Sequence, residues 1–279
     1  MPGAVAIGVI APHGDLAIAE ACDEESRSLA VATQQAMEAM AGRVAAGRPD
    51  VAVVATPHNV HVGGHLAVLP PSEVAGRLEE TADPVPLSCR VDRDLALGMV
   101  EAMNAAGVPT VGVSFGGNDP DEAVGPMDWG VHVPMWHIAR ALPELPVVVV
   151  APAREFDPAT HISAGAAIVR AARDLGRRVA FVASADQGHG HSEEGPYGFH
   201  PESAAFDAAM CDIVTRGALH ELAAIPEAEV QAALADSWWQ MLMLHGALQE
   251  DGADVASDLL AYEAPTYYGM LTAVFEPSS

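Results

Sequence analysis

Short runs of apolar, mostly β-branched residues recur along the chain and set its predicted architecture. The clearest are residues 51–55 (VAVVA) and 147–151 (VVVVA), with similar runs at 4–10, 110–115 and 178–183. Each run is too short for a core helix and lacks polar alternation, which is typical of a strand buried on both faces of a sheet. The chain is therefore predicted to be an α/β protein with a mostly parallel central sheet flanked by helices.

Segments with apolar residues at helical spacing lie between these strands. A loop rich in glycine and acidic residues at 116–133 is long enough to predict a lid or a wall of a site. No linker or repeat interrupts the alternation, so we expect one domain over residues 1–279. Helices are expected at residues 24–46, 72–80, 93–106, 135–142, 159–175, 201–222 and 226 to about 248, and a last strand at 270–275.

Histidines follow three of the predicted strands. His13 comes after the first strand in APHGD, His58 after residues 51–55 in TPHN, and His189 after residues 178–183 in SADQGH. The first strand, the first helix and residues 51–55 form a parallel βαβ unit, which brings His13 and His58 to the same edge of the sheet. Ligands of open α/β sheets bind beyond the carboxyl ends of the strands, so these histidines are candidate ligands or catalysts.

Composition narrows the range of partners and chemistries. The chain has 13 basic and 38 acidic residues, a formal net charge of -25, so we expect neither nucleic acid nor an anionic membrane as partner. All basic residues are arginines, which excludes a lysine Schiff base. Three widely spaced cysteines without a CxxC motif fit a reducing cytoplasm. Without a basic leader or an apolar stretch of about 20 residues, we expect a soluble, cytoplasmic protein.

Two histidines and a carboxylate form a familiar kind of metal site. With open coordination positions left over, they make the facial site of non-haem Fe(II) oxygenases, and the same set can hold catalytic zinc. Because the candidate ligands are far apart in the sequence, they form no local motif, and the residues by themselves leave both metals open.

In their order and spacing, these motifs resemble the class III extradiol ring-cleavage dioxygenases, the superfamily of the protocatechuate 4,5-dioxygenase catalytic subunit. The resemblance runs from the first strand to the last, and it implies that His13 and His58 are metal ligands. The run SADQGH resembles the family's Ser-Gly-Gly-Leu-Ser-His type motif, which implies that His189 is the catalytic acid/base. The pair Phe206-Asp207 is similar to a Phe-Asp pair that commonly follows on a helix.

The resemblance also implies a carboxylate ligand. In the family it is usually a Glu about two turns before a Gly-Ala-Leu-like step in a late helix. The step here is at 246–248, and the acid near that distance is Asp236, whose side chain is one methylene shorter. Glu250 and Glu263 are the other candidates. On one continuous helix Asp236 and Glu250 would lie about 21 Å apart along the axis, so both cannot bind one ion.

The central loop departs from the family pattern. Many members have Asp-His-Gly there, and that histidine contacts substrate or oxygen, whereas this chain has Trp129 between Asp128 and Gly130. His132 lies close enough in sequence to take over its role. We expect Trp129, His132, His191 and His200 to be the substrate-binding residues.

The resemblance implies Fe(II), ahead of Mn(II) or Zn(II), as cofactor. It implies insertion of O₂ into the ring of a catechol-type or aminophenol substrate to give a ring-opened semialdehyde, a reaction of aromatic compound catabolism. We expect a homo-oligomer, and a small accessory subunit stays open, because the sequence does not show the oligomeric state. Two alternatives stay open: a Memo-type protein of the same fold that binds metal or ligand without ring cleavage, and a zinc-dependent hydrolase. The sequence does not identify the substrate.

Overall fold

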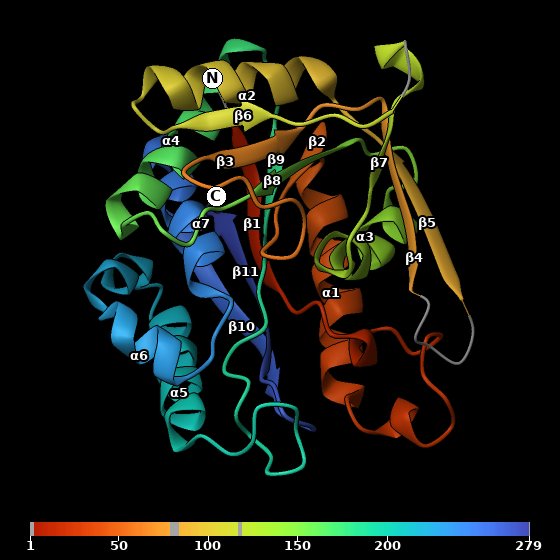
Figure 1. Ribbon diagram of the computed structural model, residues 1–279, viewed down its shortest axis with the longest axis vertical. Helices are drawn as coiled ribbons and strands as arrows, with labels where there is room; N and C mark the ends of the chain where they lie inside the picture. The colour runs from red at the N-terminus through yellow and green to blue at the C-terminus, as the bar shows by residue number, and fades with distance from the viewer. Residues whose placement is uncertain (1–2, 79–83, 117–118, 279) are drawn as a thin grey trace.

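An eight-stranded sheet forms the centre of the protein, in a computed structural model that describes residues 3–78, 84–116 and 119–278 (Figure 1). The predicted α/β class with a mostly parallel sheet is confirmed, because the four middle strands all run parallel. The strand order is β10 (Val255–Glu263), β11 (Met270–Pro277), β1 (Val5–Ala11), β9 (Val179–Ser184), β2 (Val51–Ala55), β8 (Val147–Ala151), β3 (Leu66–Leu69) and β6 (Thr110–Gly112).

Helices cover both faces of this sheet, and alternate strand residues divide between two hydrophobic cores. Val51, Val53 and Ala55 of β2 belong to one core, whereas Ala52 and Val54 belong to the other. The first core lies beneath α2 (Arg93–Ala105), α4 (Pro158–Asp174) and α7 (Trp238–Asp251), and the second beneath α1 (Val31–Gly47) and α3 (Trp129–Ala141). Figure 1 shows α4 and α7 at the left of the sheet and α1 and α3 at the right.

The other helices lie around this framework. Among the described residues, none of the helices combines the length and the apolar character that a membrane span requires. The remaining α-helices are α5 (Pro201–Thr215) and α6 (Glu227–Ala232), and single 3₁₀ segments span Asp15–Ala17, Ser26–Ser28, Pro120–Glu122 and Leu219–Ala224.

A second, three-stranded sheet replaces one of the predicted helices. Residues 72–80 were expected to be helical, but β4 (Glu73–Leu78) pairs antiparallel with β5 (Val85–Arg90) and parallel with β7 (Val124–Pro126). Pairing on both sides outweighs the weak helical pattern of so short a segment. Positions 79 and 80 of the predicted helix, and positions 117 and 118 of the predicted loop, lie outside the described residues.

The long helix predicted from residue 226 to about 248 is broken into α6 and α7. Leu234, between them, has φ of 54°, in the left-handed region where a helix ends. The backbone N–H of Ala235 then donates back to the carbonyl of Val230, which closes the end of α6. Asp236 therefore lies in the connection between the two helices and not on a helix.

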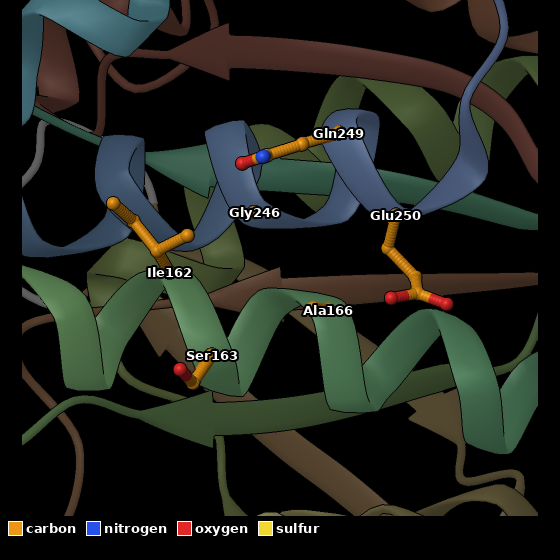
Figure 2. Close-up of a pocket in the computed structure, with 6 residues that line it drawn as sticks. All are labelled: Ile162, Ser163, Ala166, Gly246, Gln249 and Glu250. Atoms are coloured by element: carbon orange, nitrogen blue, oxygen red, sulfur yellow. The ribbon is translucent and has the colours of Figure 1, made fainter.

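The packing of α4 against α7 depends on two glycines. A Cβ on Gly165 would overlap the carbonyl oxygen of Met243, and one on Gly246 would overlap the carbonyl oxygen of Ile162. Gly246 is eight residues into α7, which places it about 12 Å along the helix axis from the first residue of α7. The contact between α4 and α7 at the glycines is therefore separate from the strand exits. A pocket of about 360 Å³ lies between the helices. Figure 2 shows the residues that line it: Ile162, Ser163 and Ala166 of α4 and Gly246, Gln249 and Glu250 of α7.

The order of the middle strands positions the three histidine-bearing strand ends. β9 pairs with β1 on one side and with β2 on the other, so these two strands are not direct neighbours. Because all three strands are parallel, the loops that follow them leave the same edge of the sheet. In Figure 1 this is the side on which the loops after β1 and β9 descend from the sheet.

Candidate metal centre

His13 lies two residues beyond β1 and is only 2% exposed. Its backbone N–H donates to Oδ1 of Asp186 at 3.0 Å, and its ring Nδ1 lies 2.9 Å from the hydroxyl oxygen of Ser184. Ser184 donates its own hydrogen to the carbonyl of Gly130, so its oxygen accepts from His13. The imidazole therefore holds a proton on Nδ1, and Nε2 is the nitrogen that faces its other neighbours.

Pro134 makes the carbonyl of Gly130 available for this contact. In an α-helix that carbonyl would accept from the backbone N–H four residues later, at position 134. Proline has no N–H, so the carbonyl of Gly130 has no partner within α3. The hydroxyl of Ser184, at the end of β9, donates to this carbonyl instead. A proline in α3 thus helps to orient a histidine that follows β1.

His58 lies three residues beyond β2, beside the start of α3. Asp128 joins these two segments: its Oδ1 accepts from the Thr56 hydroxyl at 2.8 Å and from the Val131 N–H at 3.2 Å, where it caps α3. This connection brings the ring of Trp129 to 4.5 Å from the ring of His58, with 34° between their planes. Because Asp128 caps the helix, α3 begins six residues earlier than predicted, and the expected loop of 116–133 is shorter.

Asp236 completes a cluster with the two histidines. Its Oδ2 lies 3.0 Å from Nε2 of His58 and 3.5 Å from Nε2 of His13, and the two Nε2 atoms are 3.0 Å apart. Asp236 is 5% exposed and reaches the histidines from the α6–α7 connection, which removes the difficulty posed by its short side chain on a helix. Among the His, Cys, Asp and Glu residues that the structure describes, these three form the group with ligand atoms within 4.8 Å of one another.

The geometry of this cluster fits a divalent cation. Ligand atoms bonded at about 2.1 Å to one ion lie about 3.0 to 3.4 Å apart, depending on whether they are arranged octahedrally or tetrahedrally, and the three separations here agree. The second oxygen of Asp236, Oδ1, is buried without a hydrogen-bond partner. An unpaired buried carboxylate oxygen is unfavourable, and a cation would compensate it.

The electrostatics of the cluster point the same way. Burial opposes a charge on His13, but Asp186 and Asp236 raise its pKa to about 9. Burial also opposes the charge on Asp236, yet His13 and His58 hold the pKa of this carboxyl well below its usual value. Burial raises the pKa of Asp186, and Asp236 adds to this, while His13 opposes it. By themselves these groups retain a proton on Nε2 of His13, in the place that a metal ion would take.

His189 lies beside the cluster without joining it. Its Nε2 is 4.0 Å from Oδ2 of Asp236, and its Nδ1 is 2.8 Å from the carbonyl oxygen of Gln187. A carbonyl only accepts, so Nδ1 carries the hydrogen and neutral His189 presents the lone pair of Nε2. The residue can therefore accept and return a proton next to the group that would hold the metal.

Comparison with known proteins places the chain in a family. Residues 8–275 match the model of the catalytic LigB subunit of aromatic ring-opening dioxygenases. The chain belongs to this family. Membership supports an enzyme of dioxygenase type, and LigB dioxygenases are typically metal-dependent.

The chain is also similar to a curated protein and to a solved structure. "Protein CA_C1420" of Clostridium acetobutylicum is 23% identical over 256 residues, covering 90% of this chain and 53% of its own length, so the chain spans about half of that relative. The crystal structure of the uncharacterized protein JW3007 from Escherichia coli K12 is similar with a TM-score of 0.61 and 18% identity, over 96% of this chain and 98% of that one. The second likeness concerns the fold alone.

Asp207, of the Phe-Asp pair that resembles the LigB family's, holds the segment that carries His189. It is 1% exposed, and its Oδ1 accepts from the backbone N–H of Gly188 at 2.7 Å. Its Oδ2 accepts from Nε2 of His191 at 2.8 Å and from the Tyr262 hydroxyl at 2.7 Å. The structure thus pairs the ring of His191 with the carboxylate of Asp207.

The other predicted substrate-binding residues lie in different surroundings. Trp129 is half exposed against His58, beside the cluster. His132 is 1% exposed, and its ring is stacked 6.3 Å from that of Trp136. Nε2 of His200 is 3.1 Å from the carbonyl oxygen of Tyr197. The structure therefore brings Trp129 to the histidine cluster, and gives His132 and His200 other neighbours.

The two alternative carboxylates have partners elsewhere. Glu250 binds Arg170 and Arg173 at the end of α7, with Nη1–Oε2 and Nη1–Oε1 distances of 2.8 and 3.3 Å. Glu263 accepts from the backbone N–H and the hydroxyl of Thr33, both at 2.8 Å. Neither carboxylate is part of the cluster that contains His13 and His58.

Sequence reasoning missed two features of this site. Asp186 stands in the SADQGH run where the related motif has glycine, and its Oδ2 lies 3.4 Å from Nε2 of His13. An acid at a strand exit beside a candidate ligand was the available signal. Tyr267 and Tyr268 place their ring centroids 6.0 and 5.8 Å from that of His189, and only their position before the last strand hinted at this.

Proposed function

We propose that this protein is a non-haem Fe(II)-dependent extradiol dioxygenase that opens the ring of a catechol-type or aminophenol substrate to a semialdehyde. The observation that carries the proposal is the convergence of Nε2 of His13, Nε2 of His58 and Oδ2 of Asp236 within 3.5 Å, with a third imidazole nitrogen, Nε2 of His189, 4.0 Å from the carboxylate. Membership of the LigB family supports the reaction class.

The two histidines and the aspartate would hold the cation in the proposed enzyme. Fe(II) bound by such a set supplies adjacent free positions for both oxygens of a diol and for O₂. Nδ1 of His13 stays bonded to Ser184, so the orientation of the ring does not depend on the cation. Mn(II) and Zn(II) fit the same donors, and Zn(II) would lack the redox chemistry.

His189 is the proposed acid/base. Its Nε2 takes a proton from a substrate hydroxyl and later returns a proton to an oxygen of the breaking O–O bond. The hydrogen bond from Nδ1 to Gln187 keeps the accepting nitrogen directed toward Asp236. On the other side of the cluster, the half-exposed ring of Trp129 offers an apolar face to a planar substrate and displaces water there.

A substrate panel tests this proposal. Protein reconstituted with Fe(II) under argon is mixed with catechols and aminophenols in air-saturated buffer, and O₂ uptake and visible absorbance are followed together. At least one substrate should consume one O₂ per ring opened and turn yellow. The same protein loaded with Zn(II) is the matched control and should be silent. Silence of the Fe(II) form across the panel would contradict the proposal.

One observation favours a second candidate, a metal-binding protein of the same fold without ring cleavage. Trp129 replaces a histidine that contacts substrate or oxygen in many related enzymes, and His132 lies buried against Trp136. Metal binding without O₂ uptake in the panel would support this candidate.

A further inference from the structure

Three tyrosine rings lie next to the ring of His189. We name Tyr197, Tyr267 and Tyr268 the tyrosine wall. Their ring centroids lie 6.2, 6.0 and 5.8 Å from that of His189, and Tyr267 contacts both of the others, at 6.2 and 4.9 Å. Tyr197 is 57% exposed, whereas Tyr268 is 7% exposed.

The hydroxyls of the tyrosine wall are not used within the protein. Across the described residues, no hydrogen bond involves the hydroxyl of Tyr197, Tyr267 or Tyr268. The hydroxyl of Tyr268 lies directly over Gly14, where a Cβ would overlap it. Gly14 stands between His13 and Asp15, so a tyrosine buried by more than nine-tenths presents an unpartnered polar atom beside the metal centre.

Carboxylates lie next to these rings. Asp15 follows Gly14, over which the Tyr268 hydroxyl lies, and Asp186 forms a β-bridge with Met270, two residues after Tyr268. Burial raises the pKa of Tyr267 and of Tyr268, and the charges of Asp186 and Asp15 raise both further. Asp15 is exposed, and its side chain has no ion-pair partner among the described residues. Aromatic faces together with a free carboxylate are the elements that proteins use to bind an organic ammonium group.

The chain has no lysine, and all thirteen arginines fall within the described residues. Arg77 lies on β4 in the small sheet; for the other twelve, no hydrogen bond, ion pair or ring contact joins them to the cluster or the wall. Arg27 donates to the carbonyls of Ala19 and Cys22, and Cys22 packs in the same cluster as Tyr268, but no hydrogen bond, ion pair or ring contact joins this arginine to the wall. Arg154, which follows β8, has its guanidinium 4.7 Å from the centre of the Trp239 ring. A carboxylated substrate would therefore meet acidic groups without a matching arginine.

We propose that the tyrosine wall and Asp15 form a subsite for a positively charged side chain, so that the preferred substrates are catechols or aminophenols that carry an amine and not a carboxylate. This rests on the proposed ring-cleaving function and specifies its substrate class. The ring of the substrate lies toward Trp129 and the histidine cluster, and the ammonium group lies against Tyr197 and Tyr267.

Three catechols that differ mainly in the charge of one side chain test the subsite. Dopamine carries an ammonium, 4-ethylcatechol is neutral, and 3,4-dihydroxyphenylacetate is an anion. Binding to Fe(II)-loaded protein is measured by calorimetry under argon, and kcat/KM in air by O₂ uptake. Dopamine should be favoured over the anion by about tenfold or more, and over the neutral compound by about fivefold, in both measurements.

Two variants assign the preference to residues. Asp15→Asn should bring the ratio of dopamine to 4-ethylcatechol, in affinity and in kcat/KM, close to one, and Tyr267→Leu should weaken the binding of dopamine more than that of the neutral compound. Glu24→Gln, which removes the same charge from an exposed site in the segment after β1, is the control and should leave the ratios unaltered. A preference for the anion would overturn the subsite. If that preference were lost in Arg154→Gln, the arginine would be the group that binds the side chain.

The two measurements separate this proposal from the one on which it rests. If no catechol is cleaved but dopamine still binds in preference to the anion, and Asp15→Asn abolishes the preference, ring cleavage fails and the subsite stands. If catechols are cleaved with equal efficiency whatever their charge, the function stands and the subsite is wrong.

Discussion

The histidine cluster and the α4–α7 interface both bring together residues that are distant in the sequence, but they are built from opposite materials. The cluster consists of polar side chains whose neighbours are mainly one another, and it leaves a buried oxygen of Asp236 without a partner. The interface depends on the absence of side chains, because Gly165 and Gly246 allow two backbones to touch. The first arrangement can do chemistry at the expense of stability, and the second contributes stability alone.

The largest effect should follow from removing a member of the cluster. His58→Ala or Asp236→Ala should weaken metal binding by more than about 100-fold, because even changes behind a ligand cost 10- to 100-fold. Metal analysis after dialysis measures the loss, and circular dichroism checks that the fold persists. Glu250→Ala is the matched control. Full metal occupancy in Asp236→Ala would show that another residue supplies the carboxylate.

Replacing His189 should separate catalysis from metal binding. His189→Gln should keep the metal and bind substrate, but lose about 10² to 10⁴-fold in turnover, the contribution of a positioned acid/base. Single-turnover kinetics with the Fe(II) form measure this, alongside metal content. Loss of the metal in this variant would make His189 a ligand.

A methyl group at the helix interface should affect stability and leave the chemistry intact. Gly165→Ala forces Cβ onto the carbonyl of Met243 and should destabilise the protein by about 3 kcal/mol, measured by urea unfolding. Metal affinity of the folded fraction should not change. Gly42→Ala, in α1 with open space around its Cβ, is the control and should stabilise by up to about 1 kcal/mol. Equal effects of the two changes would contradict the close approach of α4 and α7.

A smaller effect is expected at Asp207. Asp207→Asn keeps an acceptor for Gly188, but its amide nitrogen cannot accept from His191 and Tyr262. We expect kcat to fall about tenfold with KM and metal content unchanged, because His189 loses its alignment. Asp212→Asn, on the same helix but exposed, should behave as wild type. Loss of metal in Asp207→Asn would show that the residue acts on the ligands.

The sequence predicted the elements whose signals are local. The apolar runs located the buried strands, and the histidines after β1, β2 and β9 were recognisable because parallel strands end at one edge of the sheet. The end of α6 was missed because its left-handed position is occupied by Leu234, a residue that gives no signal for a helix end. β4 was misassigned because its strand pairing depends on β5 and β7, which contact it only in the folded protein. The bond from Ser184 to Gly130 depends on such distant packing as well.

The insertion of β9 between β1 and β2 determines when the site can exist during synthesis. On the ribosome, β1 and β2 emerge long before β9, and the edges that β9 will occupy have no hydrogen-bond partners until it arrives. The separation of the loops that carry His13 and His58 is not fixed in that interval, and Asp236 emerges later still. A site that needs all three side chains is therefore complete only after β9 and Asp236 have emerged, and a nascent fragment that ends before β9 lacks it.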